Sequence, residues 1–273
     1  MKKIGSHISF KAPDYLVGSV IESINNGANT MMIYLGAPQS SRRIDESKYK
    51  LEEYIESYSD KISPKDIVIH APYITNPANP EKQKFAVDFL IRDIERMNYI
   101  GAKHLVLHPG AHTKFTRKES IETLINSLIT IFDKTINVEI SLETMSGKGT
   151  EIGTTFSELK YIIEKVNNKR LNICLDTCHA WDAGIDVTDY DELIKQLKEH
   201  DLLKLIKVIH INDSKNKFGA AKDRHENIGK GFIGLKALKK IVNSKEFDNV
   251  LMILETPWVD GVPIYDKEIK MLK

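Results

Sequence analysis

Cysteine is scarce in this chain of 273 residues, which contains only two. Cys174 and Cys178 lie in one short stretch, so they predict neither a disulfide framework nor a structural zinc finger, because a zinc finger needs a second pair of ligands. We expect both side chains to be buried apolar residues. Free thiols are typical of a reducing compartment, so the chain is expected to be cytoplasmic.

The sequence also lacks long apolar runs and an excess of one charge. No apolar run approaches the roughly 18 residues of a membrane span, and no apolar segment precedes Gly5 as in a signal peptide. The 39 Lys and Arg residues balance 38 Asp and Glu residues, which gives a net charge of +1. This balance indicates neither a membrane nor a nucleic-acid partner. Any polyanion would have to be bound by a local basic patch.

Linkers and low-complexity segments are missing too, which favours one domain over residues 1–273. Short apolar runs alternate with amphipathic helical patterns, and this alternation is typical of repeated βα units. The expected strands cover residues 3–8, 30–35, 67–70, 104–108, 138–143, 171–176, 207–212 and 250–255. The expected helices cover residues 15–26, 46–59, 80–100, 118–134, 156–166, 189–204, 235–243 and 265–272.

Eight such units in one chain of this length predict an α/β fold, a (β/α)8 TIM barrel. No Gly-x-Gly-x-x-Gly motif follows the first run, which disfavours an open dinucleotide-binding sheet. The active site of a TIM barrel lies at the C-terminal ends of the parallel strands. The residues that end each predicted strand are therefore the candidates for function.

Most of these strand ends carry a side chain that can bind a metal. The candidates in or after the strands are His7, His70, His108, Glu143, Asp176, His210 and Glu255. A peripheral group consists of His179, Asp223 and His225. Mixed nitrogen and oxygen donors suit zinc or manganese, and one zinc takes about four ligands, so two or three ions are expected. A carboxylate such as Glu143 could bridge two of them.

Clustered metal ions are a recurring device for phosphodiester hydrolysis, which is the leading chemistry for this set. Other interpretations of single residues remain open. Asp176 could simply cap the next helix, with His179 an ordinary loop histidine. His7 and His112 are expected to hydrogen-bond to ligands rather than to bind metal themselves.

Three motifs carry a resemblance to a known family. They are Leu142-Glu143-Thr144-Met145-Ser146-Gly147-Lys148-Gly149, Cys174-Leu175-Asp176-Thr177-Cys178-His179, and His210-Ile211-Asn212-Asp213-Ser214-Lys215 with Asp223-Arg224-His225 and Ile228-Gly229-Lys230-Gly231. These segments resemble the signatures of the endonuclease IV family of apurinic/apyrimidinic (AP) endonucleases. The likeness extends to His70-Ala71-Pro72-Tyr73 and His108-Pro109-Gly110-Ala111-His112, and so covers essentially the whole chain.

The resemblance implies a metal-dependent DNA repair hydrolase. Such an enzyme cuts the phosphodiester on the 5′ side of an abasic site, leaves a 3′-OH and a 5′-deoxyribose phosphate, and also repairs blocked 3′ ends. It implies three Zn²⁺ per chain, with Mn²⁺ as an alternative at one site. The implied ligand sets are His70, His108 and Glu143; Glu143, Asp176, His210 and Glu255; and His179, Asp223 and His225. Asp176 and His179 would then bind different ions, connected by a loop.

The implied partner is double-stranded DNA with abasic sites or blocked 3′ ends, bound by a monomer. Tyr73 matches a family side chain that inserts into the duplex. Gln39 aligns with a second such position, where the family has Arg, so Arg42 or Arg43 could share that role or contact phosphate. Arg224 and Lys230 belong to a basic patch that would contact the DNA backbone, together with Lys215, Lys217 and Lys222.

Two other functions remain to be separated from this one. A metal-dependent sugar isomerase or epimerase would share the barrel, but it would need only one or two metal ions and no DNA-binding loops. A non-catalytic protein could retain the barrel and bind damaged DNA without cutting it. The intact set of nine ligands argues against lost catalysis.

Overall fold

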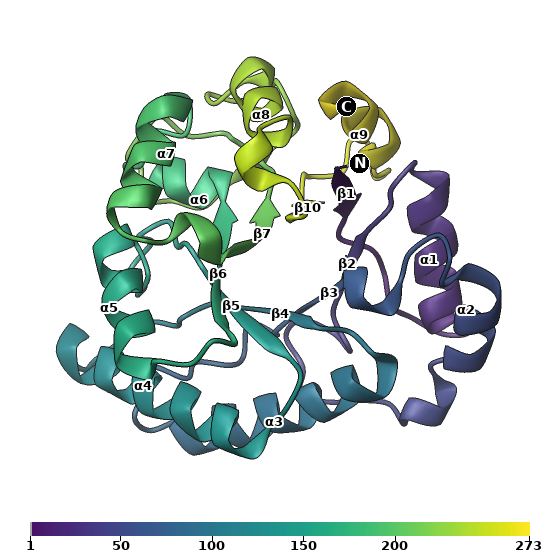
Figure 1. Ribbon diagram of the computed structural model, residues 1–273, viewed down its shortest axis with the longest axis horizontal. Helices are drawn as coiled ribbons and strands as arrows, with labels where there is room; N and C mark the ends of the chain where they lie inside the picture. The colour runs from purple at the N-terminus through teal and green to yellow at the C-terminus, as the bar shows by residue number, and fades with distance from the viewer. Residues whose placement is uncertain (1) are drawn as a thin grey trace.

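The computed structural model describes residues 2–273, and its centre is a ring of eight parallel strands (Figure 1). The strands are β1 Lys3–Ser6, β2 Met31–Ile33, β3 Ile67–His70, β4 His104–Leu107, β5 Glu139–Glu143, β6 Leu171–Asp176, β7 Ile206–His210 and β10 Leu251–Leu254. Their order in the sheet is β1-β10-β7-β6-β5-β4-β3-β2. A parallel bridge between His7 and Met32 joins β1 to β2. The predicted (β/α)8 TIM barrel is therefore confirmed.

Helices surround the strands, and each predicted helical segment overlaps one of them (Figure 1). They are α1 Tyr15–Asn25, α2 Leu51–Tyr58, α3 Gln83–Ile100, α4 Arg117–Lys134, α5 Phe156–Val166, α7 Tyr190–Glu199, α8 Leu235–Val242 and α9 Tyr265–Leu272. Local chemistry sets several ends. Thr116 and Glu119 form a capping box at α4, and Gly101 ends α3 with a φ of 85°.

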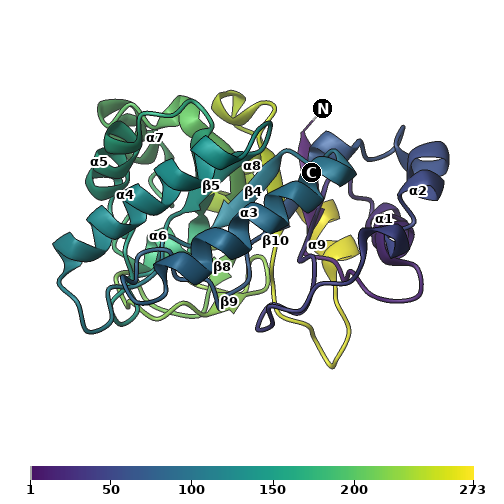
Figure 2. The ribbon, with the colours of Figure 1, turned by 90° about the horizontal axis from the view of Figure 1, so that it is seen from below.

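Three elements beside the candidate ligands were not predicted. A short helix, α6 Thr177–Asp182, follows β6 directly. A small antiparallel hairpin, β8 Asp213–Ser214 with β9 His225–Glu226, follows β7. In Figure 2 this hairpin lies toward the lower edge of the molecule, which is the side where the C-terminal ends of the barrel strands lie. The unpredicted elements therefore shape the same end of the barrel as the predicted site.

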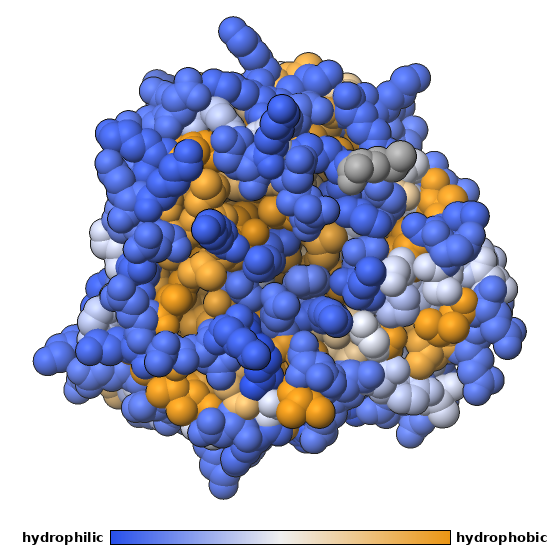
Figure 3. Space-filling view, viewed as in Figure 1, coloured by the Kyte–Doolittle hydropathy of each residue, from blue (hydrophilic) through white to orange (hydrophobic). Residues whose placement is uncertain are grey.

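Apolar side chains from most of the strands fill the barrel interior. These side chains form a buried cluster of Met32, Val68, Val106, Cys174, Val208, Leu251 and Ile253. A larger apolar layer packs between the strands and the helices. Apolar residues of the core are visible between hydrophilic helices in the view of Figure 3. Cys174 and Cys178 are both free and buried, as the sequence predicts.

Nothing in residues 2–273 has the combination of helix length and apolarity that crossing a membrane requires.

Candidate active site

The period of the strands places the candidate ligands in one layer. Side chains of a strand alternate between its two faces, so a residue two positions after an interior residue also points inward. His70 follows Val68 in this way, and Asp176 follows Cys174. The same rule applies to the other strand-end candidates His108, Glu143, His210 and Glu255. Six strands therefore direct one candidate ligand each into the mouth of the barrel.

Glu143 lies at the centre of this layer and is 1% exposed. Its Oε2 is 3.2 Å from His70 Nε2 and 3.2 Å from His108 Nε2. Its Oε1 is 3.2 Å from His210 Nδ1. Burial raises the pKa of the Glu143 carboxyl, but the imidazoles of His210 and His108 outweigh it and hold the pKa well below its usual range. Glu143 thus offers one charged oxygen to each of two groups of donors.

A second group forms on the other side of Glu143. His210 Nδ1 lies 2.9 Å from Glu255 Oε2 and 3.7 Å from Asp176 Oδ2. Glu143, Asp176, His210 and Glu255 each place one donor atom within 4.8 Å of the others. Burial raises the pKa of the Glu255 carboxyl, but the imidazole of His210, and to a smaller extent that of His70, lowers it well below its usual range.

The third group lies on the outer side of the cluster. Asp223 Oδ1 is 3.1 Å from His179 Nε2 and 3.7 Å from His225 Nε2. Asp176 also lies within 4.8 Å of donors on His179 and His225. The sequence assigned Asp176 to the second group alone, whereas in the structure it lies between the second and third groups.

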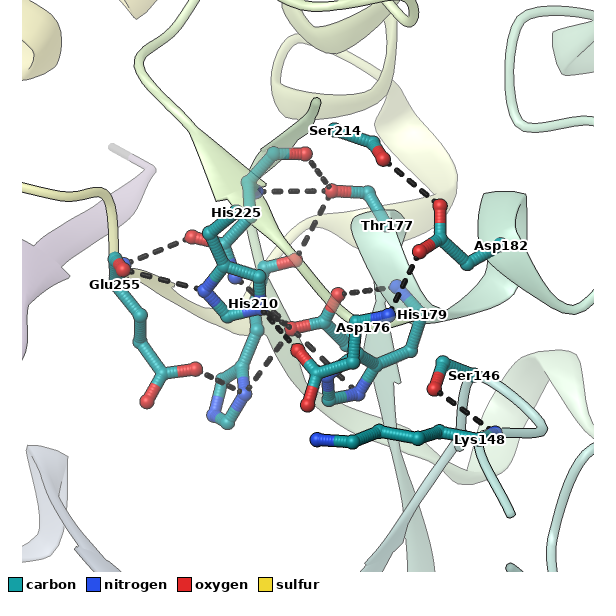
Figure 4. Close-up of polar contacts among 12 residues, drawn as sticks. Ser146, Lys148, Asp176, Thr177, His179, Asp182, His210, Ser214, His225 and Glu255 are labelled. Carbon is teal, nitrogen blue, oxygen red and sulfur yellow. Dashed lines mark hydrogen bonds and ion pairs between the residues drawn. The ribbon is translucent and has the colours of Figure 1, made fainter. Parts of the chain in front are cut away.

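Helix α6 explains this position, and it corrects the expectation of a loop between Asp176 and His179. Asp176 Oδ1 accepts a hydrogen bond from the His179 backbone N–H at 2.8 Å and so caps α6. Its Oδ2 accepts one from Asn212 Nδ2 at 2.9 Å. Because one turn of helix separates the two residues, their side chains converge (Figure 4). The capping interpretation and the ligand interpretation of Asp176 are therefore compatible.

Backbone carbonyls orient three of the histidine rings. His70 Nδ1 lies 2.7 Å from the carbonyl oxygen of Ala71, and His179 Nδ1 lies 3.0 Å from that of Thr144. His225 Nδ1 lies 3.2 Å from the carbonyl oxygen of Glu255. An Nδ1–H that donates to a carbonyl leaves the Nε2 lone pair available for a metal. In each of these rings Nε2 faces a carboxylate of the cluster.

The donor set fits metal ions. Among the residues described, His225 Nε2 is buried and has no hydrogen-bond partner, although it points toward Asp176 and Asp223. An unpaired buried nitrogen is costly unless something binds it. Imidazole nitrogens and carboxylate oxygens are together the ligands of zinc and manganese. The cluster lines a cavity of about 630 Å³ that opens at the barrel mouth.

Carboxylates outside the cluster shape the loops that carry it. Asp182 accepts hydrogen bonds from Ser214 Oγ, Asn216 Nδ2 and the Asp223 backbone N–H, each at 2.8 Å. Buried Asp213 accepts from the backbone N–H groups of Gly229, Gly231, Ile233 and Gly234. Sequence reasoning missed both roles, although both residues lie in or beside the motifs.

The candidate DNA-contacting residues lie around the same mouth. Tyr73, Gln39 and Arg224 line the cavity, and Lys230 is exposed outside it. Tyr73 is 55% exposed, and its backbone N–H donates to Pro38 O at 2.9 Å. This bond joins the two loops that carry Tyr73 and Gln39.

The two arginines after Gln39 differ in their surroundings. Arg42 is exposed, whereas the guanidinium of Arg43 pairs with Asp93 of α3 at 2.8 and 2.9 Å. The side chains of Arg43 and Asp93 are 5% and 2% exposed. Arg43 therefore anchors its loop to α3 and is not free to enter a duplex.

Two residues near the cluster complete the inward layer. Tyr34 follows Met32 by two positions, and its ring centroid is 4.9 Å from that of His70. His7 lines the cavity, and burial lowers its pKa. The alternation of side chains along β2 would have placed Tyr34 in the inward layer, but a tyrosine is not among the usual ligands of zinc, so it was not selected from the sequence. His112 is absent from the cavity lining, and its Nδ1 lies 3.0 Å from Phe115 O.

A parallel barrel with imidazoles and carboxylates at its mouth defines a class of metal-binding TIM-barrel enzymes. The family described as xylose isomerase-like TIM barrel matches residues 22–273. The probable endonuclease 4 of Mycoplasmopsis agalactiae is 57% identical over 272 residues, 100% of this chain and 98% of that protein. That of Mycoplasma mobile is 60% identical over 269 residues, 98% of this chain and 96% of that protein.

A solved structure agrees with these relatives. Endonuclease IV from Thermus thermophilus superposes with a TM-score of 0.85 at 25% identity, over 99% of this chain and 97% of that chain. The chain belongs to the endonuclease IV family, and the resemblance predicted from its motifs is confirmed. It is accordingly an enzyme of the hydrolase class.

Proposed function

We propose that this protein is an AP endonuclease that hydrolyses the phosphodiester on the 5′ side of an abasic site in double-stranded DNA. The products would be a 3′-OH and a 5′-deoxyribose phosphate, and blocked 3′ ends would be repaired by the same site. The cluster centred on Glu143 carries this proposal, because it gathers nine imidazole and carboxylate side chains at one barrel mouth. The names of the relatives support it.

We propose further that the cluster holds three Zn²⁺, with Mn²⁺ as an alternative at one site. The sets are His70, His108 and Glu143; Glu143, Asp176, His210 and Glu255; and His179, Asp223 and His225. When bound, such ions lower the pKa of a coordinated water and stabilise charge on phosphoryl oxygens. Asp176 belongs to the second set and also lies close to His179 and His225 of the third, so it would influence both sites.

The residues of the chain would bind and orient the substrate. Glu143 and Glu255 stay ionised at neutral pH, so they keep their oxygens free of protons. Tyr73 and Gln39 would enter the duplex at the lesion, since both face the cavity from loops joined by a hydrogen bond. Arg224 and Lys230 would contact phosphates, which positions DNA without reading its sequence.

The sugar isomerase or epimerase remains the second candidate, because the matched family is described by its likeness to xylose isomerase. One or two metal ions would serve that reaction. The outer group with Asp223 and the exposed ring of Tyr73 both favour DNA as the substrate.

We also propose that one chain acts alone in the cytoplasm. All nine candidate ligands come from a single chain and face a single cluster, so no second copy is needed to complete it. The two free thiols, Cys174 and Cys178, suit a reducing compartment.

Removal of metal should abolish cleavage. We expect the protein to nick a duplex with one abasic analogue on the 5′ side of the lesion, and to lose this activity after treatment with a strong chelator. Elemental analysis should give about three zinc-like ions per chain, in line with about four ligands per ion. An undamaged duplex is the control. Equal cutting of that duplex, or full activity of metal-depleted protein, would contradict the proposal.

Replacement of Tyr73 should weaken lesion binding without loss of metal. A ring that stacks on bases contributes about 1–3 kcal/mol, so Tyr73→Ala should reduce affinity for an abasic duplex by that amount. Fluorescence anisotropy measures the affinity, and elemental analysis measures the metal. Tyr161→Ala is a matched control, because Tyr161 is 45% exposed on α5. Unchanged affinity of the Tyr73 variant would exclude insertion.

A further inference from the structure

Lys148 is a cation in the site cavity to which no role has yet been assigned. It lines the cavity together with Tyr73, Arg224 and the histidines of the cluster. Figure 4 shows its side chain extending from its loop past His179 toward the centre of the cluster. The cavity lining is otherwise dominated by imidazoles and carboxylates.

The backbone around Lys148 is held in a fixed conformation. Its N–H donates to Glu151 Oε2 at 2.9 Å, and Ser146 Oγ donates to the same oxygen at 3.1 Å. Gly147 and Gly149 flank it with φ values of 83° and 62°, a region that favours glycine. A hydrogen-bonded turn therefore presents this lysine at a defined place on the cavity wall.

The ammonium group of Lys148 is left without a carboxylate partner. Across residues 2–273, Asp223 pairs with His179 and His225, and no carboxylate forms an ion pair with Lys148. Lys148 lines the same cavity as Asp223, His179 and His225. Lys148 is thus near the outer group and still has all of its hydrogen bonds to donate.

We propose that Lys148 binds a phosphate oxygen of the DNA strand that enters the cavity. An unpaired ammonium on a rigid turn suits a phosphate, because Lys offers three donors on a compact charge. Lys148 shares the cavity wall with His179, Asp223 and His225, so it would meet a phosphate that enters beside the outer group. Lys148 is a substrate-positioning residue, and this inference rests on the proposed cleavage of DNA.

The test is the salt dependence of DNA binding. The probe is a duplex with one tetrahydrofuran abasic analogue and a phosphorothioate on its 5′ side, which resists hydrolysis and keeps the charge. Each phosphate contact contributes about 0.9 to the slope of log K against log salt concentration, so Lys148→Gln should lower the slope by about one contact. The affinity of this variant should fall about tenfold or more at low salt.

Three controls separate binding from a structural effect. Lys103→Gln makes the same charge change at an exposed residue just before β4, on the opposite end of the barrel, and should leave the slope unchanged. Lys148→Arg should restore most of the slope, since it keeps the charge. The metal content and melting temperature of Lys148→Gln should equal those of the wild type.

Three negative results have different meanings. If the wild-type protein binds the abasic duplex no better than an intact one, the proposed function fails, and the role of Lys148 fails with it. If the wild type prefers the lesion but Lys148→Gln keeps the wild-type slope, only the role of Lys148 is excluded. Loss of metal from Lys148→Gln would also overturn the phosphate-binding role. It would indicate instead that Lys148 helps to hold Asp223 in place.

Discussion

Glu143→Gln is expected to abolish nicking at abasic sites and to remove metal from two of the three proposed sites. The amide keeps the volume of the side chain but loses the charge that Glu143 shares between its two neighbouring groups. Changes to groups that merely orient metal ligands already cost about 10–100-fold in affinity or activity, so a shared ligand should cost at least about 100-fold. A gel assay of the nicked duplex and elemental analysis give the two readouts.

The control for this variant lies on the same strand. Glu139→Gln changes the first residue of β5, where Oε2 accepts a hydrogen bond from Asn172 at 2.9 Å, far from the mouth. It should keep the activity and metal content of the wild type. Normal cutting by Glu143→Gln would refute the central role of Glu143. A wild-type protein that binds the lesion but never cuts it would support the non-catalytic alternative.

Asp93→Ala should cause the largest loss of stability. It removes the partner of Arg43 and leaves a guanidinium that is 5% exposed and stacked 4.6 Å from the centroid of the Phe89 ring. Breaking a buried ion pair in this way costs about 3–5 kcal/mol. For a chain of this size, that loss lowers the melting temperature by roughly 10 °C. The free loop around Gln39 should also bind lesions more weakly.

An exposed pair provides the comparison. Glu81→Ala removes the ion pair between Glu81 and Lys114, whose side chains are 62% and 65% exposed, respectively. This change should lower the free energy of unfolding by less than about 1 kcal/mol. The double variant Arg43→Met with Asp93→Leu should recover much of the lost stability, because apolar residues can replace a buried pair. Equal melting temperatures for the Asp93 and Glu81 variants would show that the buried pair does not anchor the loop.

The barrel and most of the candidate cluster could be predicted from the sequence because both follow from strand periodicity. The alternation that buries Val68 and Val106 also turns His70 and His108 inward, two positions later. The parallel register then brings all strand ends to one mouth. Local pattern and global position agree at these residues.

The sequence could not predict features that depend on contacts between distant segments. Helix α6 has only six residues, too few for a periodic signal, and its start depends on the Asp176 side chain. The pairing of Arg43 with Asp93 spans 50 positions, so the pattern of charges did not distinguish it from exposed Arg42. Whether the Lys148 ammonium has an ion-pair partner likewise depends on residues that lie near it only in the folded chain.

The use of main-chain carbonyls to orient His70, His179 and His225 has a consequence for how this protein tolerates mutation. A carbonyl oxygen is present at Ala71 and Thr144 whichever amino acid occupies those positions. Substitutions that keep the backbone in place therefore leave the ring nitrogens correctly aimed. The orientation of these three rings therefore depends on the path of the main chain, and the side chains at positions 71 and 144 are not needed for it.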